Sequence, residues 1–234
     1  ESDYVIVTAK TESKSKSEGV RIFIVETNLP GVNYIKQNKL GSHNSDMTEI
    51  SFENVKIPIE NLLGDPEEEF DLIGHSIYGS LSMASISLGT SEFALEKTLK
   101  YLKEREFFGD PVAKFQVLRH RIARMASEIE LNRQFLINLY KRFEKGNYLF
   151  KEALMAKLLA TQLCDRVILQ SFQTFGGDGL IDEYPLTRIL RNSKSEQIGG
   201  GTSEILCEIL SKVIINPKEF NKLKKKVKKQ TSKI

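Results

Sequence analysis

The spacing of apolar positions along the chain changes once, between residues 62 and 70. Before that point, short runs of β-branched and aromatic residues alternate with polar or glycine-containing segments, which is typical of strands and turns. The predicted strands cover residues 4–8, 21–25, 32–35 and 49–52, and the polar residues 10–19 predict a hairpin connection. Because the first strand begins almost at the first residue, we expect part of its sheet to precede it in sequence.

From about residue 70 onward, apolar residues recur three and four positions apart, which predicts helices. Long helices are expected over residues 76–107, 117–143 and 149–175, and a shorter one from residue 202 to about 215. Long helices with short links favour an antiparallel bundle. The predicted fold class is α+β: part of an antiparallel β domain (residues 1–62), an all-α four-helix bundle (63–216) and a basic tail (217–234).

Composition and charge limit the class of protein. A chain of 234 residues, 40% of them hydrophobic, can bury one or two cores, and it holds no apolar run of membrane-spanning length. Residues 217–234 hold eight lysines and one glutamate. Such a tail could contact an anionic membrane, but we expect a solvated extension. No aromatic residue follows Phe220, so a base-stacking groove and a nucleic-acid partner are not expected.

Cysteine and histidine usage predicts no metal centre and no disulfide. Cys164 and Cys207 are far apart and lie among apolar residues, so we expect two reduced core thiols in an intracellular protein. The three histidines are dispersed, and no Cys/His set has the spacing of zinc ligands.

Three consecutive glycines, residues 199–201, lead into Thr202, Ser203 and Glu204 and then into an apolar helical stretch. Thr202 is a suitable helix N-cap, and Glu204 suits the helix dipole. A bare backbone at a helix start can bind anions through its free N–H groups. The stretch is not a P-loop, since no lysine follows, and not a Rossmann fingerprint, since no strand precedes it. An ordinary turn remains an alternative.

Two further stretches could carry chemistry. Residues 173–179, Gln-Thr-Phe-Gly-Gly-Asp-Gly, end the most apolar predicted helix, and a helix C-cap explains only one of the glycines. Residues 105–109, Arg-Glu-Phe-Phe-Gly, are followed closely by Phe115 and Gln116. Arg105 near a helix end either interacts with the helix dipole or contacts a phosphate through its guanidinium.

Taken in order, these stretches resemble the acyl-CoA dehydrogenase family. The matching series is Arg-Glu-x-Phe-Gly, Phe-Gln, Gln-x-x-Gly-Gly-x-Gly, Glu-Tyr-Pro at 183–185, Arg-Asn at 191–192 and Ile-Gly-Gly-Gly-Thr-Ser-Glu-Ile at 198–205. Residues 52–58 look like the end of the family's middle β domain, and residues 61–64 look like the lead into its C-terminal bundle. The resemblance covers residues 2 to about 216.

The resemblance implies an oxidoreductase that is a flavoprotein. Family members bind FAD, oxidise an acyl-CoA to the trans-2-enoyl-CoA in fatty-acid or branched-chain catabolism, and pass electrons to an acceptor flavoprotein. They act as dimers or homotetramers, in the cytoplasm of prokaryotes or the mitochondrion of eukaryotes. This chain resembles only the end of the middle domain and the C-terminal domain, so we do not expect it to complete a site alone.

The resemblance also assigns roles by position. The residues that match contacts to the FAD pyrophosphate and adenine, made across a subunit interface, are Arg105, Phe108, Gln116, Gln173, Thr174, Phe175, Gly176 and Gly177. The residues that match the loop closing over the flavin are Thr202, Ser203 and Glu204. The residues expected at the substrate are Tyr78, Gly79, Ser80, Gly200 and Gly201.

The resemblance breaks at the catalytic base. The reaction needs a carboxylate that removes the thioester α-proton while hydride leaves the β-carbon. Most relatives place this glutamate just before Gly-Thr, at the position of Gly200, and others place it on the first long bundle helix, at Gly79. The arginine that usually follows the second position is Ser80.

Three hypotheses follow from this gap. Another residue, His75 or Tyr78, could act as the base, although a capping histidine and a packing tyrosine are the ordinary roles for such residues. The chain could instead be a base-less FAD-binding subunit that supports a catalytic partner in a hetero-oligomer. Finally, the flavin could carry out oxygen-dependent oxidase chemistry, which needs no such glutamate.

Overall fold

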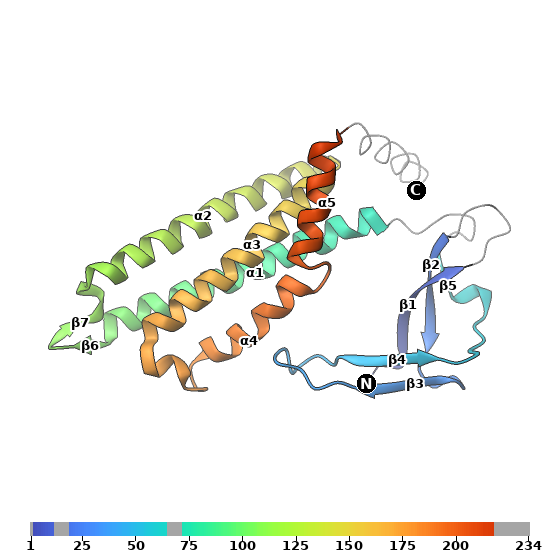
Figure 1. Ribbon diagram of the computed structural model, residues 1–234, viewed down its shortest axis with the longest axis horizontal. Coiled ribbons are helices and arrows are strands. Elements are labelled where there is room, and N and C mark those ends of the chain that lie inside the picture. Colours follow the sequence, from blue (N-terminus) through green and yellow to red (C-terminus); the bar gives the residue numbers. More distant parts are fainter. Residues whose placement is uncertain (1, 12–18, 65–71, 218–234) are drawn as a thin grey trace. The chain divides into compact units, whose positions relative to one another are not determined.

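The strand-forming sequence at the start of the chain folds into two small antiparallel sheets (Figure 1). In the computed structural model, which describes residues 2–11, 19–64 and 72–217, β1 (Tyr4–Thr11) pairs with β2 (Gly19–Glu26), and β2 pairs with β5 (Leu62–Leu63). β3 (Val32–Lys36) and β4 (Thr48–Phe52) form the second sheet. A 3-10 turn, η1 (Ile59–Asn61), precedes β5. The predicted strands are therefore confirmed, while the link between β1 and β2 lies outside the described residues.

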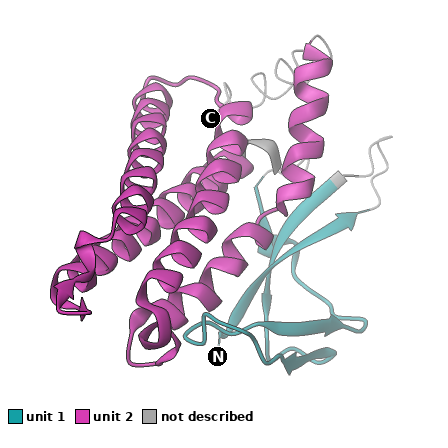
Figure 2. Cartoon of the chain, turned by 60° about the vertical axis from the view of Figure 1, so that its left-hand side comes forward, with its two compact units in different colours: residues 1–72 teal, residues 73–234 magenta. Residues whose placement is uncertain are grey.

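The rest of the described chain is helical. Its helices are α1 (Leu72–Glu104), α2 (Gln116–Glu144), α3 (Phe150–Phe175), α4 (Pro185–Ile198) and α5 (Ser203–Ile215). Figure 2 colours the two compact units of the chain, residues 1–72 and 73–234. The predicted α+β class is confirmed, with α4 present in addition to the four predicted helices. The basic tail beyond Pro217 lies outside the described residues.

The core of the helical unit lies around α3, which packs against α2, α4 and α5. Its buried side chains include Ala153, Leu154, Ala156, Ala160, Leu163, Val167 and Ile168. Small alanine side chains allow the neighbouring helices to approach closely. Within the described ranges, no helix is both long and apolar enough to cross a bilayer.

The two cysteines differ in environment, and both are free thiols. Cys164 is fully buried in α3, and burial raises the pKa of its thiol to about 12. Cys207 is exposed, so the expectation of two core thiols is wrong for this residue. The reason is local, because α5 directs Leu206 and Leu210 into the core and Cys207 lies on the other face of the helix.

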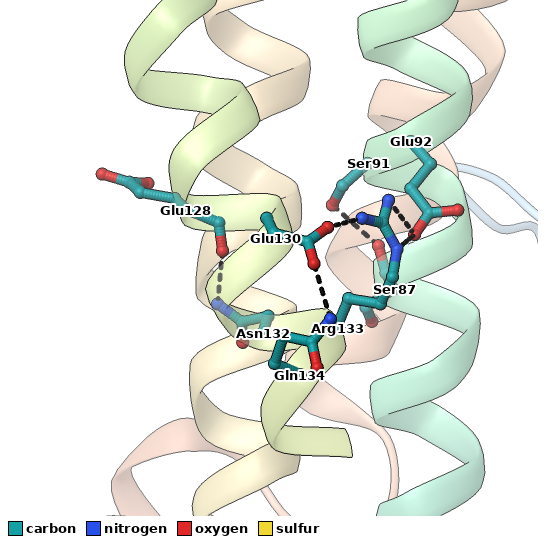
Figure 3. A network of polar contacts seen from close by, with 8 residues as sticks. All are labelled: Ser87, Ser91, Glu92, Glu128, Glu130, Asn132, Arg133 and Gln134. Atoms are coloured by element: carbon teal, nitrogen blue, oxygen red, sulfur yellow. Dashed lines mark hydrogen bonds and ion pairs between the residues drawn. The ribbon is translucent and has the colours of Figure 1, made fainter. Parts of the chain in front are cut away.

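Polar contacts tie α1 to α2 (Figure 3). Arg133 of α2 contacts one carboxylate oxygen of Glu92 on α1 through its Nε, at 3.0 Å, and its Nη2, at 2.9 Å. The same guanidinium contacts Glu130 through Nη1. These contacts join the middle of α1 to α2.

Candidate functional site

The link between α1 and α2 presents an exposed aromatic ring on a tight hairpin. The hairpin consists of β6 (Glu106–Phe107) and β7 (Asp110–Pro111), and a 3-10 turn, η2 (Val112–Lys114), leads on to α2. Phe108 has a φ of +56°, a conformation that costs a non-glycine residue about 1–2 kcal/mol. Its side chain is 99% exposed. A strained hairpin that holds a phenyl ring in solvent is consistent with a ligand or partner covering that ring.

The end of α3 lies beside the end of α1. The helix stops at Phe175, and η3 (Gly176–Leu180) follows. The Tyr101 hydroxyl of α1 donates to Asp178 at 2.9 Å, and burial, helped by this hydrogen bond, raises the pKa of Tyr101 to about 12. Arg105 lies 3.9 Å from the same carboxylate. The fold thus brings together two of the three glycine-containing stretches.

The residues expected at FAD divide into exposed and buried sets. Those exposed at this end of the bundle are Arg105, Phe108, Gln116, Gln173, Gly176 and Gly177. Thr174 is buried, and its hydroxyl accepts a hydrogen bond from Arg121 at 2.9 Å. Phe175 is 4% exposed and stacks on Tyr101 at 4.1 Å between ring centroids. The side chains of Thr174 and Phe175 therefore support the loop, and only their backbone is left for a ligand.

The glycine loop between α4 and α5 exposes backbone donors. Gly200 and Gly201 have φ angles of +62° and +97°, which side-chain-bearing residues rarely adopt. The Thr202 hydroxyl accepts from the Ile205 N–H at 3.4 Å, so the predicted N-cap is confirmed. The N–H groups of Gly200, Gly201 and Thr202 meet no acceptor among the residues described. Ser203 and Glu204 begin α5, with Glu204 exposed.

A buried lysine, which the sequence analysis missed, holds this loop. Lys157 of α3 is 1% exposed, and its ammonium donates to the carbonyls of Gly199 at 2.5 Å and Gly201 at 2.6 Å. Burial lowers the pKa of Lys157. The available signal was a lysine in the middle of α3 with apolar neighbours on both sides, Ala156 and Leu158.

The start of α1 carries the other predicted substrate residues. Tyr78 is 62% exposed and meets Phe143 edge-on, with ring centroids 4.9 Å apart. Gly79 is exposed, and a Cβ atom there would meet nothing within 4 Å. Ser80 is buried. His75 belongs to α1, but its side chain lies outside the described residues.

A second missed residue is a buried carboxyl group four positions before Gly200. Glu196 of α4 is 8% exposed and accepts a hydrogen bond from the Ser87 hydroxyl of α1. Burial raises the pKa of Glu196, although the hydrogen bond from Ser87 opposes the shift. An acid with a raised pKa is a candidate general base. Its side chain, however, faces the core of the bundle and ties α1 to α4.

We expect Glu196→Gln to stabilise the protein at neutral pH. The raised pKa means that the folded state keeps this proton to higher pH than the unfolded state does. Its stabilising contribution is therefore complete below the unfolded pKa, about 4.3, and is lost as pH rises through the folded pKa. Glutamine does not titrate and still accepts from Ser87. The variant should exceed the wild type in free energy of unfolding at pH 7 but not below about pH 4.

Denaturation with urea at several pH values measures this difference. The exposed Glu183→Gln is the matched control and should change the free energy of unfolding little. Equal stability of Glu196→Gln and wild type at both pH values would contradict the assignment of Glu196 as a buried structural acid.

A hollow of about 450 Å³ lies between α2 and α3, and none of the predicted site residues lines it. Its lining residues are Val117, His120, Arg121, Arg124, Met125, Glu128, Arg166, Val167 and Gln170. Arg166 pairs with Glu128 at 3.1 Å, and Arg121 donates to Thr174. Across the described ranges, no three His, Cys, Asp or Glu side chains are grouped to hold a metal ion.

Comparison with known proteins identifies the family. Residues 78–215 match the family model for the acyl-CoA dehydrogenase C-terminal domain. The probable acyl-CoA dehydrogenase YngJ of Bacillus subtilis is 36% identical over 214 residues, which are 90% of this chain and 56% of that protein. Mitochondrial isovaleryl-CoA dehydrogenase of Solanum tuberosum is 34% identical over 210 residues, 86% of this chain and 49% of its own length.

Solved structures agree with this result. The structure of butyryl-CoA dehydrogenase from Megasphaera elsdenii has a TM-score of 0.82 and 33% identity, covering 91% of this chain and 56% of that one. This chain thus spans about half the length of the relatives it matches. On the strength of the family model and these relatives, the chain belongs to the acyl-CoA dehydrogenase family.

Proposed function

We propose that the protein containing this chain is an FAD-dependent acyl-CoA dehydrogenase, to which the chain contributes the C-terminal bundle. The glycine loop between α4 and α5 carries the proposal. It offers three N–H groups without acceptors among the described residues, and no side chain obstructs their approach to a flat ring or a thioester carbonyl. Such donors favour the charge that develops on the carbonyl oxygen as the α-proton leaves.

The exposed groups at the α1–α3 end suit the other half of FAD. The guanidinium of Arg105 can bind a pyrophosphate, the ring of Phe108 can stack on adenine, and Gly176 and Gly177 leave backbone accessible. Thr202, Ser203 and Glu204 would lie at the flavin, which when bound accepts the hydride.

The two halves of this cofactor site are far apart within one chain. Lys157, beside the glycine loop, and Phe175 are both on α3, about 27 Å apart along the axis at 1.5 Å per residue. That separation supports the proposal that each end of the bundle serves a different FAD. A second copy of the protein would then complete each site, in a dimer or tetramer.

We expect Arg105→Ala to weaken FAD binding about 10- to 100-fold, which corresponds to the loss of one charge-assisted contact. Asp178, 3.9 Å away and partly exposed, competes only weakly for the guanidinium. Flavin fluorescence titration of the full-length apoprotein measures the affinity. Arg188→Ala, which removes another exposed arginine of the bundle, is the control. Equal losses in both variants would contradict a specific role for Arg105.

The base-less FAD-binding subunit of a hetero-oligomer is the second candidate function. The observation that favours it is the absence of a carboxylate at both Gly79 and Gly200. Glu196 does not fill the gap, because it is buried against Ser87. In the first candidate, His75 or Tyr78 would take the proton. Tyr78 is exposed on α1 directly beside Gly79.

One experiment separates these candidates. The full-length protein is purified, its visible spectrum is recorded, and acyl-CoAs of graded chain length are added without air. Bleaching of a bound flavin by one chain length supports a dehydrogenase, whose electrons would pass to an acceptor flavoprotein. A bound flavin that never bleaches supports the base-less subunit, and oxygen consumption without another acceptor indicates oxidase chemistry. A protein without flavin would overturn the proposal.

A further inference from the structure

Lys157 is a charged group in an unfavourable place. Its ammonium is buried in the bundle, and among the described residues no ion pair joins it to a carboxylate. An unpaired buried charge costs several kcal/mol, so apolar packing alone does not explain a lysine here. Its two short hydrogen bonds to the glycine loop are the contacts that offset this cost.

Both of these hydrogen bonds act on peptide groups of the glycine loop. The carbonyl of Gly199 belongs to the same peptide unit as the N–H of Gly200, and the carbonyl of Gly201 belongs to that of Thr202. A donor on the carbonyl oxygen draws electron density from the amide, which strengthens the N–H as a donor. Both N–H groups lack acceptors among the described residues. The charge of Lys157 therefore acts, through two peptide units, on two free donors.

The same contacts fix the shape of the loop. Two successive residues with positive φ, Gly200 and Gly201, are flexible in isolation, since glycine populates many conformations. The ammonium donates to the carbonyls of Gly199 and Gly201, the residues on either side of Gly200. The N-cap at Thr202 fixes the following turn. Preorganised donors stabilise developing charge better than donors that must first be ordered.

We propose that Lys157 is a positioning residue of the active site, which holds and polarises the N–H groups of Gly200 and Thr202 toward an oxygen that becomes negatively charged. Under the proposed function, on which this inference rests, that oxygen belongs to the acyl thioester or to the reduced flavin ring. The chemistry is shared, because both oxygens gain charge and both accept hydrogen bonds.

The test uses a 3-oxoacyl-CoA as the probe for the thioester. This compound loses its C2 proton to water and forms an enolate whose charge lies on the carbonyl oxygens and which absorbs in the near ultraviolet. No catalytic base is required. In the full-length flavoprotein, we expect Lys157→Met to lower the bound enolate fraction roughly tenfold at a given pH. Equilibration with a redox dye then measures the reduction potential of the bound flavin. If a flavin oxygen accepts these hydrogen bonds, this potential should be lower in Lys157→Met than in the wild type.

Two further variants make the result decisive. Lys157→Gln keeps N–H donors without the charge, so it should fold even if Lys157→Met does not, and it should give an intermediate loss. Lys194→Met removes a lysine that pairs with Asp165 at 2.7 Å and should leave both readouts unchanged. An unchanged enolate fraction and an unchanged potential in a folded, flavin-loaded Lys157 variant would overturn the proposal. Failure of the wild type to bind flavin or probe would instead refute the proposed function.

Discussion

A glutamate placed at Gly79 is expected to accelerate reduction of the bound flavin by an acyl-CoA about 10²- to 10⁴-fold, the usual contribution of a positioned general base. The site can accept the side chain, because Gly79 is exposed on α1 and an added Cβ meets nothing within 4 Å. Replacing glycine inside a helix should also stabilise the fold by roughly 0.5–1 kcal/mol. Anaerobic stopped-flow absorbance of the full-length protein measures the rate.

Gly79→Gln is the matched control, since it has the same size without a basic carboxylate, and it should give no acceleration.

A glutamate placed instead at Gly200 provides a second comparison. A side chain at φ +62° costs about 1–2 kcal/mol, and its Cβ would lie 3.6 Å from the Lys157 ammonium. That cation would lower the pKa of the new carboxyl group and weaken it as a base, so a smaller gain is expected. If wild type already reacts as fast as Gly79→Glu, a native base exists, and His75 and Tyr78 are the first to replace.

Phe175→Ala is expected to reduce the free energy of unfolding by about 3–5 kcal/mol, the typical cost of deleting a buried phenyl ring. The ring is stacked on Tyr101 with an interplanar angle of 16°, and it meets Tyr184 edge-on with centroids 5.5 Å apart. Urea denaturation followed by far-UV circular dichroism measures the loss. Leu180→Ala, at an exposed position five residues later, should change stability little.

The same variant tests how Phe175 would serve the proposed FAD site. In the core, the ring can act on FAD only through the backbone that it supports, so stability and flavin content should fall together. A Phe175→Ala protein that loses flavin at full stability would show instead that the ring contacts FAD directly.

Much of the fold could be predicted from periodicity, because strands and long helices bury regular faces. α4 escaped prediction because it buries only a few apolar side chains, such as Leu186 and Ile189, between polar neighbours. The order of the motifs along the chain also identified the family correctly. It could not show that Arg105 and Asp178 meet, because that contact depends on two helices ending at the same level.

Lys157 and Glu196 show where a sequence pattern fails in principle. A charged residue in an amphipathic pattern is read as solvent-facing, yet both of these residues face the interior. Their partners, two loop carbonyls for one and Ser87 for the other, come from distant parts of the chain. Only the packed structure reveals that these charges are buried, and burial gives them their altered acidity.

The length of α1 has a consequence for how this protein can vary. The helix runs unbroken for 33 residues, with Gly79 near one end and Arg105 just past the other. Inserting a single residue between them would rotate everything beyond it by about 100° and advance it by about 1.5 Å. Arg105 would then leave Asp178. We therefore expect α1 to tolerate substitutions on its exposed face but not insertions or deletions. The β6–β7 hairpin that follows it could accommodate an insertion or deletion more easily.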